Sequence, residues 1–592
     1  DWDECSANGF DPAAANTVDC SMPAASPPSP EPAPAVELQD YTETTTLRIE
    51  KFKGCMFVNQ YLVVKFLGRG ACGKVFLCLN THDLRLYAMK AVRKVDIEAI
   101  QPPQGGKVRR NPMDDLKREI LIMKKMRHNN IVMLSEVIDD PAGSKLLLVM
   151  EFMEGGPVLT REALEKREKL PETLARQYFR DMIKSLDYLH CNKVVHGDLK
   201  PENVLMAASG DVKLSDFGCS KIVATGNEYL ERCNGTPAFL APEMMKPNSR
   251  FRGRPTDVYA LGACLYTLIF GRIPFSAPNL YKLFQVVQTE PVRYPEDVPI
   301  SDALRNILDA MLVKNPRERI TVKDMMQHSW VTIEGKFPLK GTRELLENET
   351  QEMHNLLPLS KTFAECHPQP DLLSGLAMLS RHERTFKAGD CIMRQGDTGT
   401  FLLYIVSGTV DVLVNWVQPG PSYHAMNNTP GQPPQGGPGG DADFERSQGI
   451  SPVMDEKSYD HRCGLARASA KARDFVTSLQ NAAGGSGVRE LLVAQRGPGE
   501  LVGEMALFSK SLARGATVRC TSRMSARIIT HDQVMQYLIE QPMAKHQIRE
   551  GIWKKESEIT IVDALVKLAN VNEVIVTSLQ NSPLQAQGPP EV

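Results

Sequence analysis

The chain has 592 residues, a formal net charge of -2 and 24% charged residues, which is enough length for two or three domains. Its balanced charge gives no general attraction to nucleic acid or to membrane surfaces, so we expect neither as a partner. Thirteen cysteines are scattered without metal-ligand spacing, which is typical of reduced thiols in a cytoplasmic or nuclear protein. The most apolar run, residues 258–275, contains glycines and Arg272 and predicts a buried helix, not a membrane span.

Composition and periodicity divide the chain into segments. The first is rich in Pro, Ala and Ser (SPPSPEPAPA) and lacks the apolar residues that a core needs. A stretch of β-like runs followed by helical periods predicts an α+β domain, and short alternating strands with glycine turns predict a mainly-β domain further on. The predicted segments are a disordered N-terminus (1–50), an α+β domain (61–330), a linker (331–370), a mainly-β domain (371–565) with a Gly/Pro/Asn-rich insertion at about 416–488, and a flexible tail (566–592). Such an insertion is tolerated because loop closure costs rise only logarithmically with length.

The sequence GRGACGKV lies between two strand-like runs and contains Gly68, Gly70 and Gly73. Glycines allow backbone amides to approach phosphate oxygens closely. YAMKAV follows and places Lys90 on the next strand, where its ammonium group is positioned for the α- and β-phosphates of a nucleotide. A helical period then presents Glu119 as the ion-pair partner of Lys90.

The sequence VVHGDLKPENVL supplies further groups for phosphoryl transfer. Asp198 is the candidate base that orients a substrate hydroxyl, and Lys200 is positioned to neutralise the transferred group. Asn203, together with Asp216 of KLSDFGCS, offers the oxygen ligands that Mg²⁺ prefers. Positioning and charge neutralisation account for most of the catalysis in such a site.

These motifs, in this order, resemble the eukaryotic protein kinases over about residues 61–330, and KPEN resembles the serine/threonine branch. The resemblance implies a two-lobed kinase fold, ATP and Mg²⁺ as cofactors and a protein substrate. It also implies a support role for Asp257 and an Arg319–Glu243 pair. It implies an ATP site formed by Gly68, Arg69, Gly70, Ala71, Cys72, Gly73, Lys74, Val75, Ala88, Lys90, Met150, Glu151 and Met153, with Met150 as gatekeeper.

Within the kinases, EVIDDPAGSKLLLVMEFMEGGPVL, the insert before Glu119 and GTPAFLAPE resemble the calcium/calmodulin-dependent protein kinase kinases. HGDLKPEN resembles their plant counterparts, the geminivirus Rep-interacting kinases. The resemblance implies an AMP-activated-type kinase as substrate. Calmodulin binding is not supported, because acidic residues interrupt the segment after Trp330, unlike a basic amphipathic target.

Two positions depart from the usual kinase pattern. Gly197 replaces an arginine that in most kinases receives a phosphate on the activation loop. Cys233 stands near the place where the plant kinases have a phosphorylatable serine, and the adjacent Arg232 makes this thiol a candidate for redox regulation. We therefore expect an active enzyme that depends little on loop phosphorylation.

A second candidate site lies in GELVGEMALFSKSLARGATVRC. We expect a short helix after Gly503 to present backbone amides to an anion, and Arg514 to bind a phosphate through its planar guanidinium. Glu504 is positioned to accept a hydrogen bond from a ribose hydroxyl. With the preceding strands, this pattern resembles the phosphate-binding cassette of cyclic nucleotide-binding domains, a β-roll with flanking helices. The resemblance implies a site formed by Gly503, Glu504, Met505, Ala506, Arg514, Gly515 and Ala516. Gly515 favours cAMP over cGMP, because cGMP-selective members often have a threonine there.

Three functions are compatible with these patterns. The first is a serine/threonine kinase regulated by a cyclic nucleotide, and the second is a constitutively active kinase with a structural β-roll. The third is a catalytically inactive scaffold, which the intact Lys90, Asp198 and Asp216 disfavour. For the β-roll, we reason that unpaired buried Glu504 and Arg514 would be costly to keep without a ligand. Trp553 is expected to be a core aromatic, with capping of the nucleotide base as the alternative.

Overall fold

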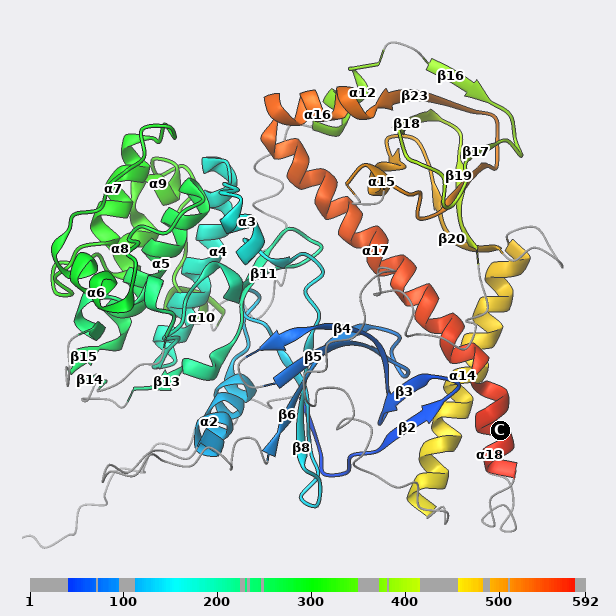
Figure 1. Cartoon of the computed structure of the whole chain (residues 1–592), viewed down its shortest axis with the longest axis horizontal. Helices are drawn as coiled ribbons and strands as arrows, with labels where there is room; N and C mark the ends of the chain where they lie inside the picture. Colours follow the sequence, from blue (N-terminus) through cyan, green and yellow to red (C-terminus); the bar gives the residue numbers. More distant parts are fainter. Residues whose placement is uncertain are drawn as a thin grey trace, which may run out of the picture. The chain divides into compact units, whose positions relative to one another are not determined.

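The computed structural model describes residues 41–70, 73–94, 112–223, 229–230, 235–245, 250–349, 372–380, 383–415, 456–482, 490–508 and 512–580. Residues Tyr41–Val592 form one compact unit, and Figure 1 shows its elements. In the described part of the chain, no helix has both the length and the apolar character that a membrane crossing requires.

The N-terminal lobe is built on an eight-stranded sheet with the order β1-β7-β8-β6-β5-β4-β3-β2. The strands β1 and β7 are parallel, and the other neighbours are antiparallel. Helix α2 (Pro112–Lys125) supplies the helical period predicted around Glu119. The strands are β1 (Thr42–Thr44), β2 (Ile49–Phe52), β3 (Cys55–Val58), β4 (Tyr61–Gly70), β5 (Gly73–Asn80), β6 (Leu86–Arg93), β7 (Leu134–Asp139) and β8 (Lys145–Glu151).

The sheet begins earlier than the sequence predicted. Strand β1 and the start of β2 lie within the segment 1–50 that was expected to be disordered, and β3 precedes the predicted start at residue 61. Lys53 (φ 45°) and Gly54 (φ 80°) connect β2 and β3 in the left-handed region that tight hairpin turns use. The strands are too short for periodicity to reveal, but they bury Phe52 and Phe57.

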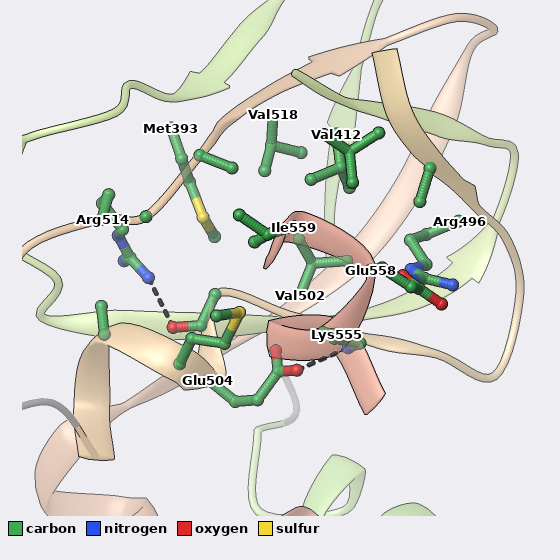
Figure 2. A pocket seen from close by; sticks show the side chains of 17 residues that line it. Met393, Val412, Arg496, Val502, Glu504, Arg514, Val518, Lys555, Glu558 and Ile559 are labelled. Carbon is green, nitrogen blue, oxygen red and sulfur yellow. Dashed lines mark hydrogen bonds and ion pairs between the residues drawn. The ribbon is translucent and has the colours of Figure 1, made fainter. Parts of the chain in front are cut away.

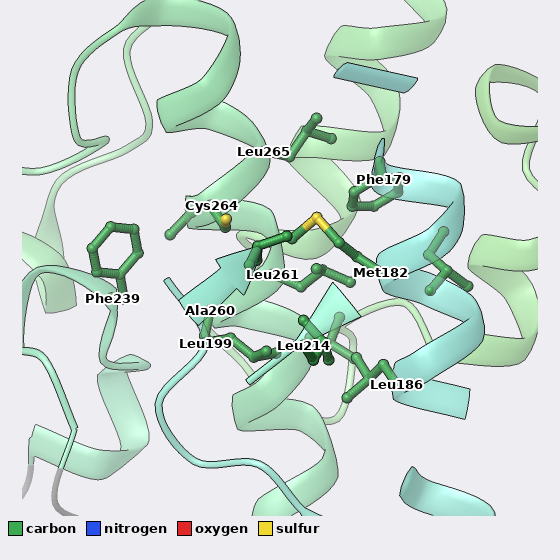
Figure 3. Packing of buried hydrophobic residues seen from close by; sticks show 14 of the residues in the cluster. Phe179, Met182, Leu186, Leu199, Leu214, Phe239, Ala260, Leu261, Cys264 and Leu265 are labelled. Atoms are coloured by element: carbon green, nitrogen blue, oxygen red, sulfur yellow. The ribbon is translucent and has the colours of Figure 1, made fainter. Parts of the chain in front are cut away.

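The C-terminal lobe is mainly helical, as the kinase resemblance implied. Helix α5 (Gly253–Phe270) is buried along nearly its whole length, which agrees with the buried helix predicted for this run. Figure 3 shows Met182 and Leu186 of α4 (Glu172–Cys191) packing near Leu261 and Leu265 of α5. The other helices are α3 (Arg161–Glu165), α6 (Leu280–Thr289), α7 (Asp302–Met311), α8 (Val322–Gln327), α9 (Ser329–Thr332) and α10 (Thr342–Glu349).

Short strands and 3-10 turns support the loops between the lobes. Antiparallel β11 and β12 flank the turn at Gly210 and follow the predicted catalytic loop. These elements are β9 (Gly156–Pro157), β10 (Val194–Val195), η1 (Pro201–Asn203), β11 (Val204–Met206), β12 (Val212–Leu214), η2 (Phe217–Cys219), β13 (Lys221–Ile222), β14 (Tyr229–Leu230), η3 (Pro237–Phe239), η4 (Pro242–Met245) and β15 (Phe251–Arg252).

The region that we call the C-terminal β-domain contains two four-stranded antiparallel sheets, ordered β16-β23-β18-β21 and β17-β22-β19-β20. Its strands are β16 (Glu383–Phe386), β17 (Cys391–Met393), β18 (Phe401–Ser407), β19 (Val410–Asn415), β20 (Glu490–Arg496), β21 (Leu501–Val502), β22 (Thr517–Cys520) and β23 (Met524–Thr530). Its helices are α12 (Leu372–Ala377), α15 (Glu504–Phe508), α16 (His531–Glu540), α17 (Pro542–Asn570) and α18 (Asn572–Gln580). Since β19 pairs with β20, the chain leaves this sheet at Asn415 and rejoins it at Glu490.

The insertion between β19 and β20 contains a 27-residue helix, α14 (Glu456–Ala482), which the sequence reading missed. Leu465, Ala468, Ala472 and Val476 lie at helical spacing and are buried in one cluster with α17 and with strands β2–β5 of the N-terminal lobe. The part of the insertion rich in Gly, Pro and Asn falls outside the described residues. Its strong composition concealed the amphipathic period that follows it.

Two further segments differ from the prediction. Helix α10 lies in the predicted linker 331–370, and most of the rest of this linker falls outside the described residues. The predicted tail from residue 566 is helical up to Gln580, because α17 continues to Asn570 and α18 follows it. Buried Leu568, Val571 and Ile575 give this segment an apolar face that the sequence reading overlooked.

Candidate phosphoryl-transfer and nucleotide sites

The glycine-rich turn connects β4 and β5, with Gly70 opposite Gly73 in the register and Gly68 opposite Val75. A Cβ added to Gly73 would lie 2.2 Å from the Ala91 carbonyl oxygen, so only glycine fits there. Arg69 and Lys74 face each other in the same register. Ala71 and Cys72, at the tip, fall outside the described residues.

Lys90 of β6 and Glu119 of α2 form a direct ion pair, with Nζ 2.8 Å from Oε1. The Glu119 side chain is only 4% exposed, so the pair is shielded from water, which strengthens it. Ala88 pairs with Met150 in the next strand, and Glu151 ends that strand. The structure thus brings the predicted phosphate lysine and the predicted adenine-facing residues onto adjacent strands.

Asp198 lies at the centre of a hydrogen-bonded cluster. Lys200 Nζ donates to Asp198 Oδ2 at 2.7 Å, and the backbone N–H and hydroxyl of Thr236 both donate to Oδ1 at 2.8 Å. Asn203 Nδ2 donates to the Asp198 carbonyl oxygen at 2.9 Å. Two predicted catalytic residues, Asp198 and Lys200, and the predicted metal ligand Asn203 therefore meet in one place, and Thr236 is a contact that the sequence reading did not identify.

These contacts keep Asp198 and Lys200 charged. Burial alone would raise the pKa of Asp198, but the hydrogen bonds from Lys200 and Thr236 and the charge of Lys200 outweigh it, so the pKa lies below its ordinary value. Burial likewise acts to lower the pKa of Lys200, but its bond to Asp198 raises the pKa above the ordinary value. A carboxylate in this state can accept a hydrogen bond from a hydroxyl and orient it.

The residues around Asp216 fit a magnesium nucleotide by their chemistry. Asp216 has a left-handed backbone (φ 63°), and its Oδ1 accepts the Gly218 N–H at 3.4 Å. The negative charge of Asp216 also contributes to the raised pKa of Lys200, so the predicted metal ligand and the predicted catalytic lysine interact electrostatically. A carboxylate and the Asn203 amide oxygen are ligands typical of Mg²⁺.

Asp257 of α5 anchors the backbone of the predicted catalytic loop. Its carboxylate accepts the backbone N–H groups of His196 and Gly197, each at 2.9 Å, and the His190 ring lies 2.9 Å from Oδ2. Gly197 has φ +80°, a conformation that glycine adopts without a Cβ penalty. The replacement of the usual arginine by glycine therefore leaves the loop anchored.

Arg319 and Glu243 form a bidentate ion pair, with Nη1–Oε1 at 2.7 Å and Nη2–Oε2 at 3.0 Å. The Arg319 side chain has no exposed surface. This pair ties the end of the substrate loop to the core of the C-terminal lobe. Arg232 and Cys233 fall outside the described residues.

A second pocket lies in the C-terminal β-domain, as Figure 2 shows. Glu504 and Arg514 line it and are 3% and 5% exposed. Arg514 donates to the carbonyl oxygens of Gly503 (2.8 Å) and Phe401 (2.5 Å), which fixes the plane of its guanidinium. Besides these, the pocket is lined by Met393, Val412, Val493, Ala494, Arg496, Val502, Met505, Ala506, Gly515, Ala516, Val518, Lys555, Glu558 and Ile559.

Glu504 and Arg514 were expected to be unpaired without a ligand, but both have partners in this pocket. Lys555 of α17 places Nζ 2.5 Å from Glu504 Oε1, and Arg514 is bonded to backbone oxygens. Lys555 was not predictable as the partner, because WKKES contains two adjacent lysines and does not show which one faces the pocket. Neither residue alone therefore requires a ligand.

Trp553 does not line this pocket. A Cβ on Gly155 would lie 2.8 Å from its ring atom Cζ3, and its ring centroid is 6.2 Å from that of His546. It packs against the main core cluster of the C-terminal lobe, and its contact Gly155 follows the segment 151–153 in the chain. Of the two roles considered for Trp553, packing as a core aromatic is the one that these contacts show.

Comparison with known proteins agrees with this architecture. A family model described as "protein kinase domain" matches residues 61–331 of this chain. A probable serine/threonine-protein kinase of Dictyostelium discoideum is 40% identical over 54% of this chain and 45% of its own length. The calcium/calmodulin-dependent protein kinase kinase of Caenorhabditis elegans is 36% identical over 52% of this chain and 60% of its own. The serine/threonine-protein kinase GRIK2 of Arabidopsis thaliana is 36% identical over 48% of this chain and 68% of its own.

The chain belongs to the protein kinase family, and its matched domain is that of a serine/threonine kinase. The prediction of an enzyme of this class is confirmed, and a domain of this class implies ATP and Mg²⁺. The alignment spans about half the length of the first of these relatives. The family model ends at residue 331, before the C-terminal β-domain begins.

Proposed function

We propose that the protein transfers the γ-phosphate of ATP to a serine or threonine of a protein substrate, and that a cyclic nucleotide binding to the C-terminal β-domain regulates this transfer. The observation that carries the first part is that the cluster of Asp198, Lys200, Asn203 and Thr236 and the Lys90–Glu119 pair are both intact. An inactive scaffold would have no need of this charge arrangement.

The substrate follows from similarity to kinases that act upstream of others. The aligned relatives include a calcium/calmodulin-dependent protein kinase kinase and GRIK2, which supports the activation-loop threonine of an AMP-activated-type kinase as substrate.

The first part is tested with the full chain, radiolabelled ATP and Mg²⁺, using Asp216→Ala as the control. Transfer of label to a kinase activation-loop peptide by the wild type and not by Asp216→Ala is expected. Binding of ATP without transfer to any protein would instead favour the scaffold.

The cyclic nucleotide part rests on the placement of Glu504, Arg514 and the Gly503–Ala506 turn around one pocket with apolar walls. A buried carboxylate and a buried guanidinium in one pocket suit a ribose hydroxyl and a phosphate, respectively. Gly515, which also lines the pocket, favours cAMP over cGMP.

A structural β-domain without a ligand is the second candidate, because Lys555 and backbone oxygens already satisfy Glu504 and Arg514. Calorimetric titration with cAMP and cGMP separates the two. Binding that is lost in Arg514→Ala supports the regulatory site, and no heat of binding with either nucleotide supports the structural role.

A further inference from the structure

Helix α17 contacts three parts of the chain, all within the compact unit Tyr41–Val592. One face belongs to the C-terminal β-domain: Ala544, Ile548 and Ile552, spaced four residues apart, are buried with Leu402 and Leu538. This spacing keeps them on one side of the helix.

A second face of α17 contacts the C-terminal lobe of the kinase. The Tyr178 hydroxyl of α4 is hydrogen-bonded to the His546 ring, and the two ring centroids are 5.4 Å apart. Two turns further on, Trp553 lies against Gly155, which follows the adenine-facing segment 151–153.

The last turns of α17 contact the N-terminal lobe. Val562 and Leu565 are buried in the same cluster as Phe57 and Leu62 of β3 and β4, and Lys53 Nζ donates to the Asn570 carbonyl oxygen at 3.2 Å. One continuous helix thus bridges both lobes. Because nucleotide exchange and turnover in such enzymes involve lobe movement, the position of α17 affects the reaction.

Between these contacts, α17 is fixed to the nucleotide pocket. Lys555 Nζ lies 2.5 Å from Glu504 Oε1 and donates to the Leu501 carbonyl oxygen at 2.8 Å. One turn later, Glu558 Oε2 lies 2.5 Å from Arg496 Nη2. Figure 2 shows Lys555 and Glu558 entering the pocket from α17. The carboxylate assigned to the ribose is therefore occupied by the helix that bridges the lobes.

We propose that Lys555 is a regulatory residue whose ion pair with Glu504 holds α17 across the two kinase lobes. A cyclic nucleotide releases α17 because its ribose hydroxyl bonds Glu504 in place of Lys555. This inference rests on the proposed cyclic nucleotide site. The ribose hydroxyl and the Lys555 ammonium compete for one carboxylate, so the nucleotide favours the released state. Such differential affinity is what coupling between two sites requires, and kinase activity rises on binding.

The experiment compares Lys555→Met with Lys555→Arg, which keeps the charge, and with Lys554→Met, an exposed neighbour. Binding of cAMP and cGMP to the full chain is measured by calorimetry, and transfer of labelled phosphate is measured with and without nucleotide. Lys555→Met is expected to bind about 10-fold more tightly, equivalent to about 1.4 kcal/mol, and to be active without nucleotide. Lys555→Arg and Lys554→Met are expected to resemble the wild type.

Hydrogen exchange on the wild type gives a second measurement that needs no variant. Addition of nucleotide is expected to speed exchange at residues 546–562. Equal affinity and equal basal activity of Lys555→Met and wild type, with binding lost in Arg514→Ala, would overturn this inference and leave the proposed function intact. If neither wild type nor Lys555→Met binds a nucleotide, the proposed nucleotide site is wrong, and the inference fails with it.

Discussion

Replacement of Gly197 by arginine tests whether the altered catalytic loop is an adaptation of an active enzyme. Gly197 has φ +80°, where a residue with a Cβ costs about 1–2 kcal/mol. Its N–H is fixed on Asp257 Oδ1 at 2.9 Å, so the loop cannot relax without breaking this bond. Gly197→Arg and Gly197→Ala should therefore both lower the free energy of unfolding by about 1–2 kcal/mol.

Unfolding of the full chain is followed by differential scanning calorimetry, and kinase activity is measured as transfer of labelled phosphate. For a domain of this size, the loss corresponds to a decrease of about 2–4 °C per kcal/mol in the kinase transition. Gly197→Ala carries the backbone strain without the charge and so serves as the matched control. Only Gly197→Arg is expected to make the activity sensitive to phosphatase, because its guanidinium can receive a loop phosphate.

The reasoning is refuted if Gly197→Ala unfolds at the wild-type temperature, since the left-handed backbone would then carry no penalty. A wild type that loses its activity on phosphatase treatment would equally contradict the expected independence from loop phosphorylation.

Three further predictions follow from contacts described above. Arg319→Ala leaves Glu243 without its buried partner and should cost about 3–5 kcal/mol, seen as a lower unfolding temperature; an unchanged temperature would show that the pair is not stabilising. Because the pKa of Asp198 is lowered, its carboxylate stays ionised until the pH falls below the ordinary pKa of an aspartate. The pH profile of kcat should therefore show no acid limb from this group above about pH 4. A limb near pH 6 that disappears in Asp198→Asn would contradict this. Leu465→Ala in α14 should destabilise the N-terminal lobe by about 2–5 kcal/mol, whereas Arg467→Ala, an exposed neighbour, should not.

The kinase site was largely predictable because each of its groups lies inside a short motif. Lys90 is far in the chain from Asp198, Asn203 and Asp216, but neighbouring residues identify each one independently. The fold then brings Asn203 into contact with Asp198 and pairs Lys90 with Glu119. Thr236 lies inside GTPAFLAPE, but the motif does not show that its threonine bonds Asp198, because that contact joins two loops that only the fold brings together.

The contacts made by α14 and α17 were not predictable in the same way. Both helices have ordinary amphipathic periods, and such a period shows that a helix has a buried face but not what covers it. Lys555 and Lys554 are equivalent in sequence, and only the rotation of α17 places one of them on Glu504. The same limitation explains why Glu504 and Arg514 were expected to be unpaired.

The role of Trp553 gives the clearest separation between the two sites that α17 touches. Its ring packs against Gly155, next to the predicted adenine-facing segment, and does not line the pocket of Glu504 and Arg514. Loss of part of the buried apolar surface of such a ring is worth on the order of 1 kcal/mol, which corresponds to about 5-fold in an equilibrium constant.

Trp553→Ala should therefore raise the KM for ATP several-fold, as measured by steady-state kinetics. Because loss of this contact favours the released position of α17, cAMP should bind at least as tightly as to the wild type, as measured by calorimetry on the same preparation. Trp553→Phe, which keeps an aromatic ring against Gly155, should restore most of the ATP affinity. If Trp553→Ala weakens cAMP binding and leaves KM for ATP unaltered, the ring caps a nucleotide base instead. The face of α17 assigned here to the kinase would then belong to the nucleotide site, because one side chain cannot support both.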